Sequence, residues 1–369
     1  MVVFLWYVYL FAAGVKLLWW LLFRITLSKK TPSPTTTSSS EGISIVVCAH
    51  SNCKGLQKLV PLLLKQDYPL FELIVVNDRS KDDTEPWLQM QAGFDNRLNV
   101  ISITQTPENW NGKKYALQQG LKKAQYPIIA LTDSDCTPRS NQWLQHVSLG
   151  FQDPKVNIFL GYSPYEYQTG ILNSLIRTET LFTAFQYLSL AKINMAYMGV
   201  GRNLGYRKSF IEKHLDHFPF QNHMGGDDDL LINTLSTQND TYTSLHVDSF
   251  IESEAPKMWS SWWQQKRRHL SAGQKYKFST QCILASFWFS SLGFWISFLA
   301  LCLFTSAFAT ILVIHSLLLV TGIIVISPIY RIFQERRALI VLPIWDFLYI
   351  ASSSVIGIST YWIKNKRWS

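Results

Sequence analysis

Charged residues are scarce in this chain, and one long stretch contains none. Asp, Glu, Lys and Arg make up 16% of its 369 residues, against about 25% in an average soluble domain. Residues 278–330 have none of the four, and 48% of the chain is hydrophobic. A membrane-spanning helix needs about 20 apolar residues, so we predict two such helices, near 281–303 and 306–328. The composition therefore excludes a wholly soluble protein.

Two further apolar stretches are each interrupted by a charged residue. Residues 338–362 contain Pro343 and Asp346, so this stretch either crosses the membrane or lies partly in its interface. Residues 1–26 contain Lys16. No charged region precedes this first stretch and no small-x-small cleavage pattern follows it, which favours a retained membrane anchor over a cleaved signal peptide.

Acidic residues are fewer than basic ones, which gives a net charge of +9. The basic residues gather beside the apolar stretches, in the clusters Arg24, Lys29 and Lys30; Lys266, Arg267, Arg268, Lys275 and Lys277; and Arg331, Arg336 and Arg337. Such clusters face the cytoplasm and favour anionic lipid. We therefore expect an integral membrane protein of a bacterial inner membrane with a cytoplasmic catalytic domain, and no nucleic-acid partner. The basic C-terminal run fits that side only if the last apolar stretch re-enters or lies flat.

Cysteine is also rare. The chain has five, Cys48, Cys53, Cys136, Cys282 and Cys302, and no two pairs have the spacing of a zinc site. Thiols in the cytoplasm stay reduced. The cysteines therefore exclude a zinc ribbon and a disulfide framework, and we interpret them as structural.

A polar segment rich in Pro, Ser and Thr follows the first apolar stretch and cannot form a core of its own. It suggests where the globular part begins. We expect an anchor at 1–26, a linker at 27–42, one globular domain at 43–257, an interfacial segment at 258–280 and a membrane region of two or three helices at 281–362.

Short β-rich runs alternate with helical patterns in the globular part. The apolar runs that we predict as strands are residues 43–49, 71–77, 98–103 and 127–133. Continuous apolar strands with helices between them are typical of a mostly parallel sheet that is covered on both faces. The pattern therefore predicts an α/β fold.

Polar residues stand where three of these strands end. Ala49 and His50 end the first, Asn77 and Asp78 the second, and Asp133 the last. Ligands of parallel sheets bind at the carboxyl ends of the strands. We therefore expect these residues to line one binding crevice.

The run "DSD" holds two carboxylates, Asp133 and Asp135, one residue apart. A sharp turn after a buried strand can direct both at one hard cation. Mg²⁺ or Mn²⁺ held by carboxylates and substrate phosphate oxygens is usual at nucleotide sites. A lone D-x-D is also common in plain surface turns, so its position after a strand is what favours a metal site.

Several motifs occur together in one order: "ISIVVCAH", "ELIVVNDRSKDDT", "NGKKYALQQG", "IIALTDSDCTP", "GVGRNLGYRKS", "GGDDDLL" and "WWQQKRRH". In this order and spacing the chain resembles the membrane-bound family 2 glycosyltransferases, which include cellulose, hyaluronan and ceramide glucosyl synthases. The resemblance covers residues 43–269 and implies a nucleotide-sugar-binding GT-A domain with flanking transmembrane helices.

The resemblance implies a donor site built mainly from four of these residues. Asp78 would hold the nucleoside, although an aspartate after a strand also caps turns. Lys113 would lie near the nucleotide, or else be a solvated lysine at a helix start. Asp133 would lie against the nucleotide sugar and Asp135 would bind the metal, with both carboxylates counted as metal ligands. Ala49 and His50 would complete the donor side.

The segment "WWQQKRRH" resembles the family motif Q-x-x-R-W. It implies that Gln265 and Arg268 hold the diphosphate, for which the planar guanidinium is suited. His269 stands where the family often has tryptophan, on the acceptor side. Trp262 and Trp263 could stack on a sugar, but tryptophan beside basic residues is typical of a membrane-interface anchor, and we favour the anchor.

The remaining motifs imply the acceptor side. Arg202 and Asn203 fall in the family's acceptor loop, where Gly199, Gly201 and Gly205 suit either a backbone close to a ligand or an ordinary turn.

The run Asp227, Asp228 and Asp229 could simply begin a helix, because acids stabilise a helix N-terminus. Three in a row exceed that need, since like charges repel. The resemblance implies that Asp228 is the general base and that Asp227 lies on the acceptor side. Of Asp227 and Asp229, one would cap the helix and the other would perturb Asp228.

The expected function is therefore an inverting, metal-dependent transfer from a nucleotide-diphosphate sugar, most simply a UDP-sugar. The acceptor would be a lipid, a lipid-linked glycan or a growing glycan. Two alternatives remain: a haloacid-dehalogenase-type phosphatase, because "DSDCT" also fits D-x-D-x-T, and a non-catalytic nucleotide-sugar-binding component of polysaccharide export.

Overall fold

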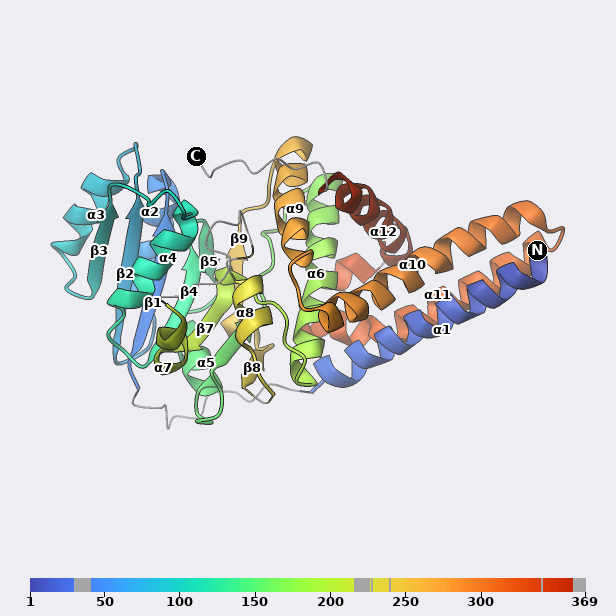
Figure 1. Cartoon of the computed structure of the whole chain (residues 1–369), viewed down its shortest axis with the longest axis horizontal. Helices are drawn as coiled ribbons and strands as arrows, with labels where there is room; N and C mark the ends of the chain where they lie inside the picture. Colours follow the sequence, from blue (N-terminus) through green and yellow to red (C-terminus); the bar gives the residue numbers. More distant parts are fainter. Residues whose placement is uncertain (30–40, 216–225, 227, 239, 340, 361–369) are drawn as a thin grey trace. The chain divides into compact units, whose positions relative to one another are not determined.

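The computed structural model describes residues 1–29, 41–215, 226, 228–238, 240–339 and 341–360. Contacts divide the chain into two compact units. We call the first the α/β unit; it holds described residues 41–167 and 190–256. The second, the helical unit, holds residues 1–29, 168–189 and the described residues from 257 onward. Figure 1 draws both units.

The α/β unit is built on a seven-stranded sheet with the strand order β3-β2-β1-β4-β7-β6-β8. Its strands are β1 (Ile43–Ala49), β2 (Phe71–Asp78), β3 (Leu98–Ile103), β4 (Ile128–Asp133), β6 (Ile158–Gly161), β7 (Leu204–Arg207) and β8 (Thr241–Ser244). Neighbouring strands are parallel except beside β7, which is antiparallel to β4 and β6. The prediction of an α/β fold with a mostly parallel sheet is confirmed.

Helices connect these strands, and Figure 1 shows α2, α3 and α4 around β1 to β4. The helices of this unit are α2 (Cys53–Leu64), α3 (Thr84–Ala92), α4 (Gly112–Lys123), α5 (Trp143–Gly150), α7 (Lys208–Ile211) and α8 (Asp229–Leu235). Short 3-10 helices are η1 (Gly201–Asn203), η2 (Glu212–His214) and η3 (Val247–Ser249), and a small second sheet pairs β5 (Cys136–Pro138) with β9 (Ile251–Ser253).

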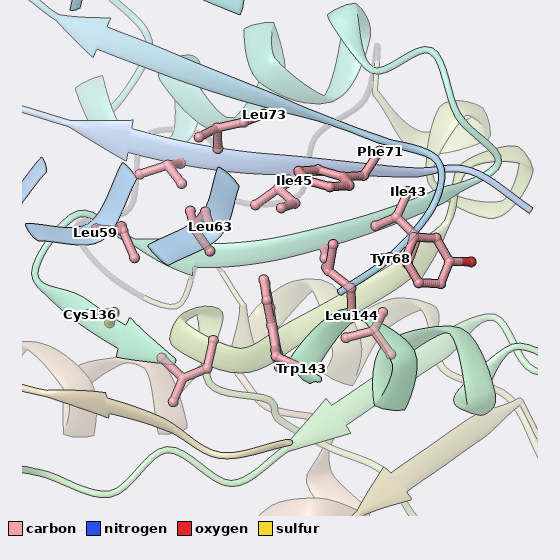
Figure 2. Close-up of a cluster of buried hydrophobic side chains, with 14 of the residues drawn as sticks. Ile43, Ile45, Leu59, Leu63, Tyr68, Phe71, Leu73, Cys136, Trp143 and Leu144 are labelled. Carbon is pink, nitrogen blue, oxygen red and sulfur yellow. The ribbon is translucent and has the colours of Figure 1, made fainter. Parts of the chain in front are cut away.

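The main core lies between the sheet, α2 and α5 (Figure 2). Ile43 and Ile45 of β1 lie in it with Leu59 of α2 and Trp143 of α5, and all four are fully buried. Burial of such a side chain contributes about 1.5–3 kcal/mol. The other sheet face packs on α4, where a Cβ on Gly120 would lie 2.5 Å from a methyl carbon of Val46. Glycine thus allows α4 to approach the sheet, and both sheet faces are covered.

The helical unit contains α1 (Val2–Leu27), most of α6 (Ile171–Lys192), α9 (Trp259–Gly273), α10 (Phe278–Phe304), α11 (Phe308–Ile332), η4 (Arg336–Leu339) and α12 (Leu342–Ser359). Among the described residues, four helices are long and apolar enough to cross a membrane: α1, α10, α11 and α12. They lie in the four apolar stretches of the sequence. Helix α12 begins only at Leu342, because the start of that stretch forms η4.

The interpretation of Trp262 as a membrane-interface anchor is wrong. Only 3% of its surface is exposed, and its indole Nε1 donates a hydrogen bond of 3.2 Å to Glu179 Oε2. Lys266 forms an ion pair of 3.0 Å with the same carboxylate oxygen. Both residues lie on α9 one turn apart, so Glu179 of α6 holds that helix inside the helical unit.

Candidate active site

The first two strand ends meet at Asp78. The backbone carbonyl of Asp78 lies 2.5 Å from His50 Nδ1, so the residue after β1 contacts the last residue of β2. The Asp78 side chain is fully buried and accepts two hydrogen bonds from Arg79, at 2.7 and 3.0 Å. A buried carboxylate needs such a partner. Arg79 follows with a positive φ of 53°, which turns the chain sharply after the strand. The nucleoside-binding role of Asp78 stays a prediction.

The D-x-D run lies at the end of β4, beside the N-terminus of α4. Lys113 Nζ lies 3.0 Å from Asp133 Oδ1, so two residues predicted for the donor site are in contact. Asn52, the N-cap of α2, donates a hydrogen bond of 3.0 Å to the hydroxyl of Ser134 between the two acids. The ends of β1 and β4 are therefore joined at this turn.

Asp135 is open to solvent but has protein groups on several sides. Ser253 Oγ lies 3.4 Å from its Oδ2, and Cys136 Sγ lies 3.6 Å from its Oδ1. The desolvation by these surroundings and the charge of Asp133 raise the pKa of Asp135, whereas Arg202 and Lys113 act to lower it. Two carboxylates that disfavour each other's charge fit a divalent cation, which removes their repulsion.

Arg202 lies on η1 and extends toward the same acids. Its guanidinium carbon lies 4.3 Å from the ring centre of Tyr165, a cation–π geometry. Its Nη2 donates to the carbonyl of Ser163 at 3.3 Å, while its buried Nη1 has no hydrogen-bond partner among the described residues. A buried guanidinium with an unmet donor beside a predicted metal site suits a phosphate oxygen. The acceptor-side role of Arg202 stays a prediction.

Asn203 is fully buried and its amide is bonded inside the protein. Its Nδ2 donates to the carbonyls of Tyr162 and Ser249 at 2.8 and 2.7 Å, and its Oδ1 accepts from Trp143 Nε1 at 3.0 Å. These bonds fix η1 to its neighbours. The contact of Asn203 with an acceptor stays a prediction, and these hydrogen bonds give no support to it.

Asp228 is held by the same short helix. Its Oδ2 accepts a hydrogen bond of 2.7 Å from the backbone nitrogen of Gly201. Asp228 is the N-cap residue of α8 but makes no capping bond with its side chain. The sequence left open whether this acid caps a helix or does chemistry; the structure directs the carboxylate to the backbone of Gly201. Asp227 lies outside the described residues.

This contact changes the explanation for why position 201 is a glycine. A Cβ on Gly201 would lie 2.3 Å from Asp228 Oδ2, so a protein carboxylate, and not a ligand, requires the glycine. The same applies to Gly199, where a Cβ would lie 2.6 Å from Ile232 Cδ1, and to Gly205, where it would lie 3.1 Å from the carbonyl of Ile129. These glycines allow close internal packing.

Gln265, Arg268 and His269 all lie on α9, in the helical unit. Their spacing of three and four residues places them on one helix face. Their contact with the diphosphate and the acceptor stays a prediction. Within the α/β unit the structure brings together Lys113 with Asp133, Arg202 with Asp135, and Asp228 with the residue that precedes Arg202.

Three neighbours of the site were not found from the sequence. Arg79 pairs with Asp78, and its only signal was its place directly after that residue. Tyr165 and Ser253 belong to no motif, although they form a β-bridge with each other and contact Arg202 and Asp135 respectively. Only the fold shows that these two lie beside the acids.

Comparisons with known proteins show what this chain is similar to. Residues 44–215 match the family described as "Glycosyl transferase family 2". The chain is 24% identical over 140 residues to the poly-beta-1,6-N-acetyl-D-glucosamine synthase of Staphylococcus epidermidis, covering 38% of this chain and 32% of that protein. It is 30% identical over 132 residues to glycosyltransferase GlyG of Streptococcus pneumoniae, covering 36% and 42%. The matches thus span well under half of these relatives.

A similar solved structure is the mannosyltransferase PcManGT from Pyrobaculum calidifontis, in complex with GDP-Man and Mn²⁺. The TM-score is 0.61 at 17% identity, and the match covers 99% of both chains. At this identity the likeness shows the fold alone, and it extends over the helices as well as the α/β unit.

Proposed function

We propose that this chain, whose residues 44–215 form a family 2 glycosyltransferase domain, is an inverting, metal-dependent glycosyltransferase. It moves a sugar from a nucleotide-diphosphate sugar, most simply a UDP-sugar, to an acceptor hydroxyl. One observation carries the proposal: Lys113, Arg202 and the acids Asp133 and Asp135 converge at the end of β4. There a parallel sheet binds its ligands.

The donor side follows from this charge arrangement. Mg²⁺ or Mn²⁺, held by Asp133 and Asp135, would neutralise the departing diphosphate when bound. The ammonium of Lys113 would bind a phosphate oxygen, since its present partner Asp133 is about 30% exposed and such a pair is weak. Arg202, which the sequence assigned to the acceptor side, would instead bind another phosphate oxygen through its unmet Nη1. Asp78, Ala49 and His50 lie at the neighbouring strand ends, where the nucleoside would bind.

Asp228 is the general base of the proposal. The hydrogen bond from Gly201 to Oδ2 orients the carboxylate, which would take the proton of the acceptor hydroxyl. An ordinary carboxylate is a weak base for an alcohol, so the proton moves as the bond between sugar and diphosphate breaks. Attack from the side opposite the diphosphate converts an α-linked donor into a β-linked product.

The acceptor side rests on the helical unit. In the part of the chain that the structure describes, four helices are long and apolar enough to cross a membrane. This favours a lipid, a lipid-linked glycan or a growing glycan as acceptor, reached at the cytoplasmic face of the membrane. Gln265 and Arg268 would hold the diphosphate from α9, and His269 would contact the acceptor.

The test is sugar transfer by membranes that contain the protein. Membranes are incubated with radiolabelled UDP- and GDP-sugars and Mg²⁺ or Mn²⁺, and lipid-soluble product is separated from polymer. We expect Asp228→Asn to lower transfer at least about 100-fold, as the loss of a general base does, while nucleotide binding is kept. Asp135→Ala should also weaken metal-dependent nucleotide binding.

Asp153→Asn is the matched control, because this acid is exposed on a loop of the same unit. It should retain full transfer. Full transfer by Asp228→Asn would refute the assignment of the base. Release of phosphate from simple esters without sugar transfer would instead favour a phosphatase, and donor binding without any transfer would favour a non-catalytic protein.

A further inference from the structure

A second cluster of polar side chains lies in the α/β unit, apart from the residues described above. His146 of α5, His246 directly before η3 and Asp248 within η3 each have one possible ligand atom, and these three atoms lie within 4.8 Å of one another. The two imidazole rings are stacked, with centroids 4.3 Å apart and planes 23° apart. Two nitrogens and one carboxylate oxygen from residues far apart in the sequence thus lie close together.

His146 is fully buried, and neither of its ring nitrogens has a hydrogen-bond partner among the described residues. A neutral imidazole has one donor and one acceptor, and leaving both unmet inside a protein costs free energy. A core histidine with no partner is thus better explained by a ligand than by packing.

The other two residues leave the position open to solvent. The side chains of His246 and Asp248 are 28% and 36% exposed. His246 Nδ1 accepts a hydrogen bond of 3.3 Å from the backbone nitrogen of Asp248 and lies 3.5 Å from Asp248 Oδ2. Asp248 supplies negative charge, which neutral histidines lack. An ion from solution can therefore reach the buried imidazole past two partly exposed ligands.

We propose that His146, His246 and Asp248 form a Zn²⁺ site that is separate from the D-x-D run. Two imidazoles and one carboxylate, with water in the fourth position, are a usual zinc ligand set. Magnesium and manganese prefer sites made of oxygen atoms. Ligand atoms of a tetrahedral zinc site lie about 3.3 Å apart, given metal–ligand distances of ~2.0–2.1 Å. Binding therefore requires the His246 ring to turn out of its stack with His146 and the Asp248 side chain to move closer.

The site would fasten η3 to α5. The two are already linked through η1, because Asn203 donates to the carbonyl of Ser249 and accepts from Trp143, the first residue of α5. A zinc ion joining His146 to Asp248 would close this link into a ring. Its effect would be to stabilise η1, which carries Gly201 and Arg202, and not to take part in chemistry.

The test measures zinc itself. Full-length, tag-free protein carrying Asp135→Ala, which removes a ligand of the D-x-D run, is purified in detergent and stripped with a chelator. ZnCl₂ is then titrated by calorimetry, and bound zinc is counted by elemental analysis after gel filtration. We expect one zinc per chain, a rise in melting temperature with zinc, and Co²⁺ absorption bands typical of a nitrogen-ligated tetrahedral site.

His246→Ala and Asp248→Asn, made in the Asp135→Ala protein, change partly exposed side chains and should fold normally. Each should weaken zinc binding by more than the ~10–100-fold lost with an outer ligand partner and abolish the rise in melting temperature. His214→Ala is the matched control, since it also removes a partly exposed imidazole from a short 3-10 helix of this unit. It should bind zinc fully.

Two results would overturn the proposal. One is the absence of bound zinc in the Asp135→Ala protein, and the other is zinc binding by His246→Ala that equals the control. Because no readout depends on sugar transfer, failure here leaves the proposed glycosyltransferase activity untouched, and an inactive enzyme leaves the zinc site standing.

Discussion

The hydrogen bond from Gly201 to Asp228 joins two motifs that the sequence keeps apart. The glycine belongs to the run with Arg202 and Asn203, and the acid begins α8. At 2.7 Å the amide donor approaches a carboxylate that lacks a capping bond. The backbone amide fixes the orientation of Asp228, and a side chain at position 201 would take the same space.

Gly201→Ala tests this positioning. Its Cβ would lie 2.3 Å from Asp228 Oδ2, so we expect the carboxylate to be displaced and kcat for transfer to fall at least about tenfold. A displacement of ~1 Å can cost 100-fold. Donor binding, measured by nucleotide titration, should stay nearly unchanged. Gly93→Ala is the control, because its Cβ would meet nothing closer than 3.3 Å. Equal kcat in both variants would contradict the positioning role.

At the scale of elements, one acid links β2, β3 and α3. Glu85, in the first turn of α3, accepts hydrogen bonds from Asn77 of β2, Ser102 of β3 and Gln89 of its own helix. Its carboxylate also complements the helix N-terminus. The acid therefore holds α3 against the sheet beside Asp78, the last residue of β2.

The stability contributed by Glu85 should depend on pH. Burial alone raises the pKa of Glu85, but hydrogen bonds from Gln89, Ser102 and Asn77 outweigh it and leave the pKa below its usual value. A carboxyl group whose pKa is lowered by folding stabilises the fold above its unfolded pKa, and loses this effect as the pH falls through the folded pKa. We therefore expect Glu85→Gln to lower the melting temperature at neutral pH.

The difference from the wild type should shrink as the pH falls below about 4.3, the usual pKa of glutamate. Thermal unfolding followed by fluorescence over this range measures it. Glu212→Gln is the control, since Glu212 is exposed and forms only a 3.5 Å pair with Lys208. A destabilisation by Glu85→Gln that stayed constant with pH would show that packing, and not charge, holds α3.

For the whole molecule, the sequence predicted those elements that a short run of residues determines by itself. The strands at β1 to β4 were found because β-branched runs are bounded by polar residues, and the acids after β4 were found because they end such a run. The four-residue strand β7 was missed, since "LGYR" has no such pattern. His146 and His246 have no shared spacing in the sequence, and only the fold brings them together. The same applies to Asn203, because no sequence motif predicts its hydrogen bonds to three distant residues.

The two charges that interrupt the apolar stretches show most clearly a contact that only the fold reveals. Lys16 of α1 and Asp346 of α12 pair at 2.8 and 2.9 Å inside the helical unit, with side chains 2% and 3% exposed. Ser291 accepts a further bond from Lys16 at 3.0 Å, and Trp295 donates to Asp346 at 2.7 Å. In the sequence each charge only interrupts an apolar stretch; in the fold the two satisfy one another, as charges within membranes do.

A double-mutant cycle tests this pair in the full-length protein. Lys16→Met or Asp346→Asn alone leaves one buried charge without its partner, which typically costs 3–5 kcal/mol. We expect each to lower the yield of monodisperse protein in detergent and its melting temperature sharply. The double variant buries no charge, so it should recover most of the stability, with a coupling energy well above the ~0.5 kcal/mol error of additivity.

Lys65→Met, an exposed lysine of the α/β unit, controls for the loss of a positive charge and should leave the melting temperature unchanged. Additive losses in the double variant would mean that Lys16 and Asp346 stabilise the helices separately. Recovery would instead show that the two residues act as a unit. Helices α1 and α12 would then depend on each other for the burial of their charges.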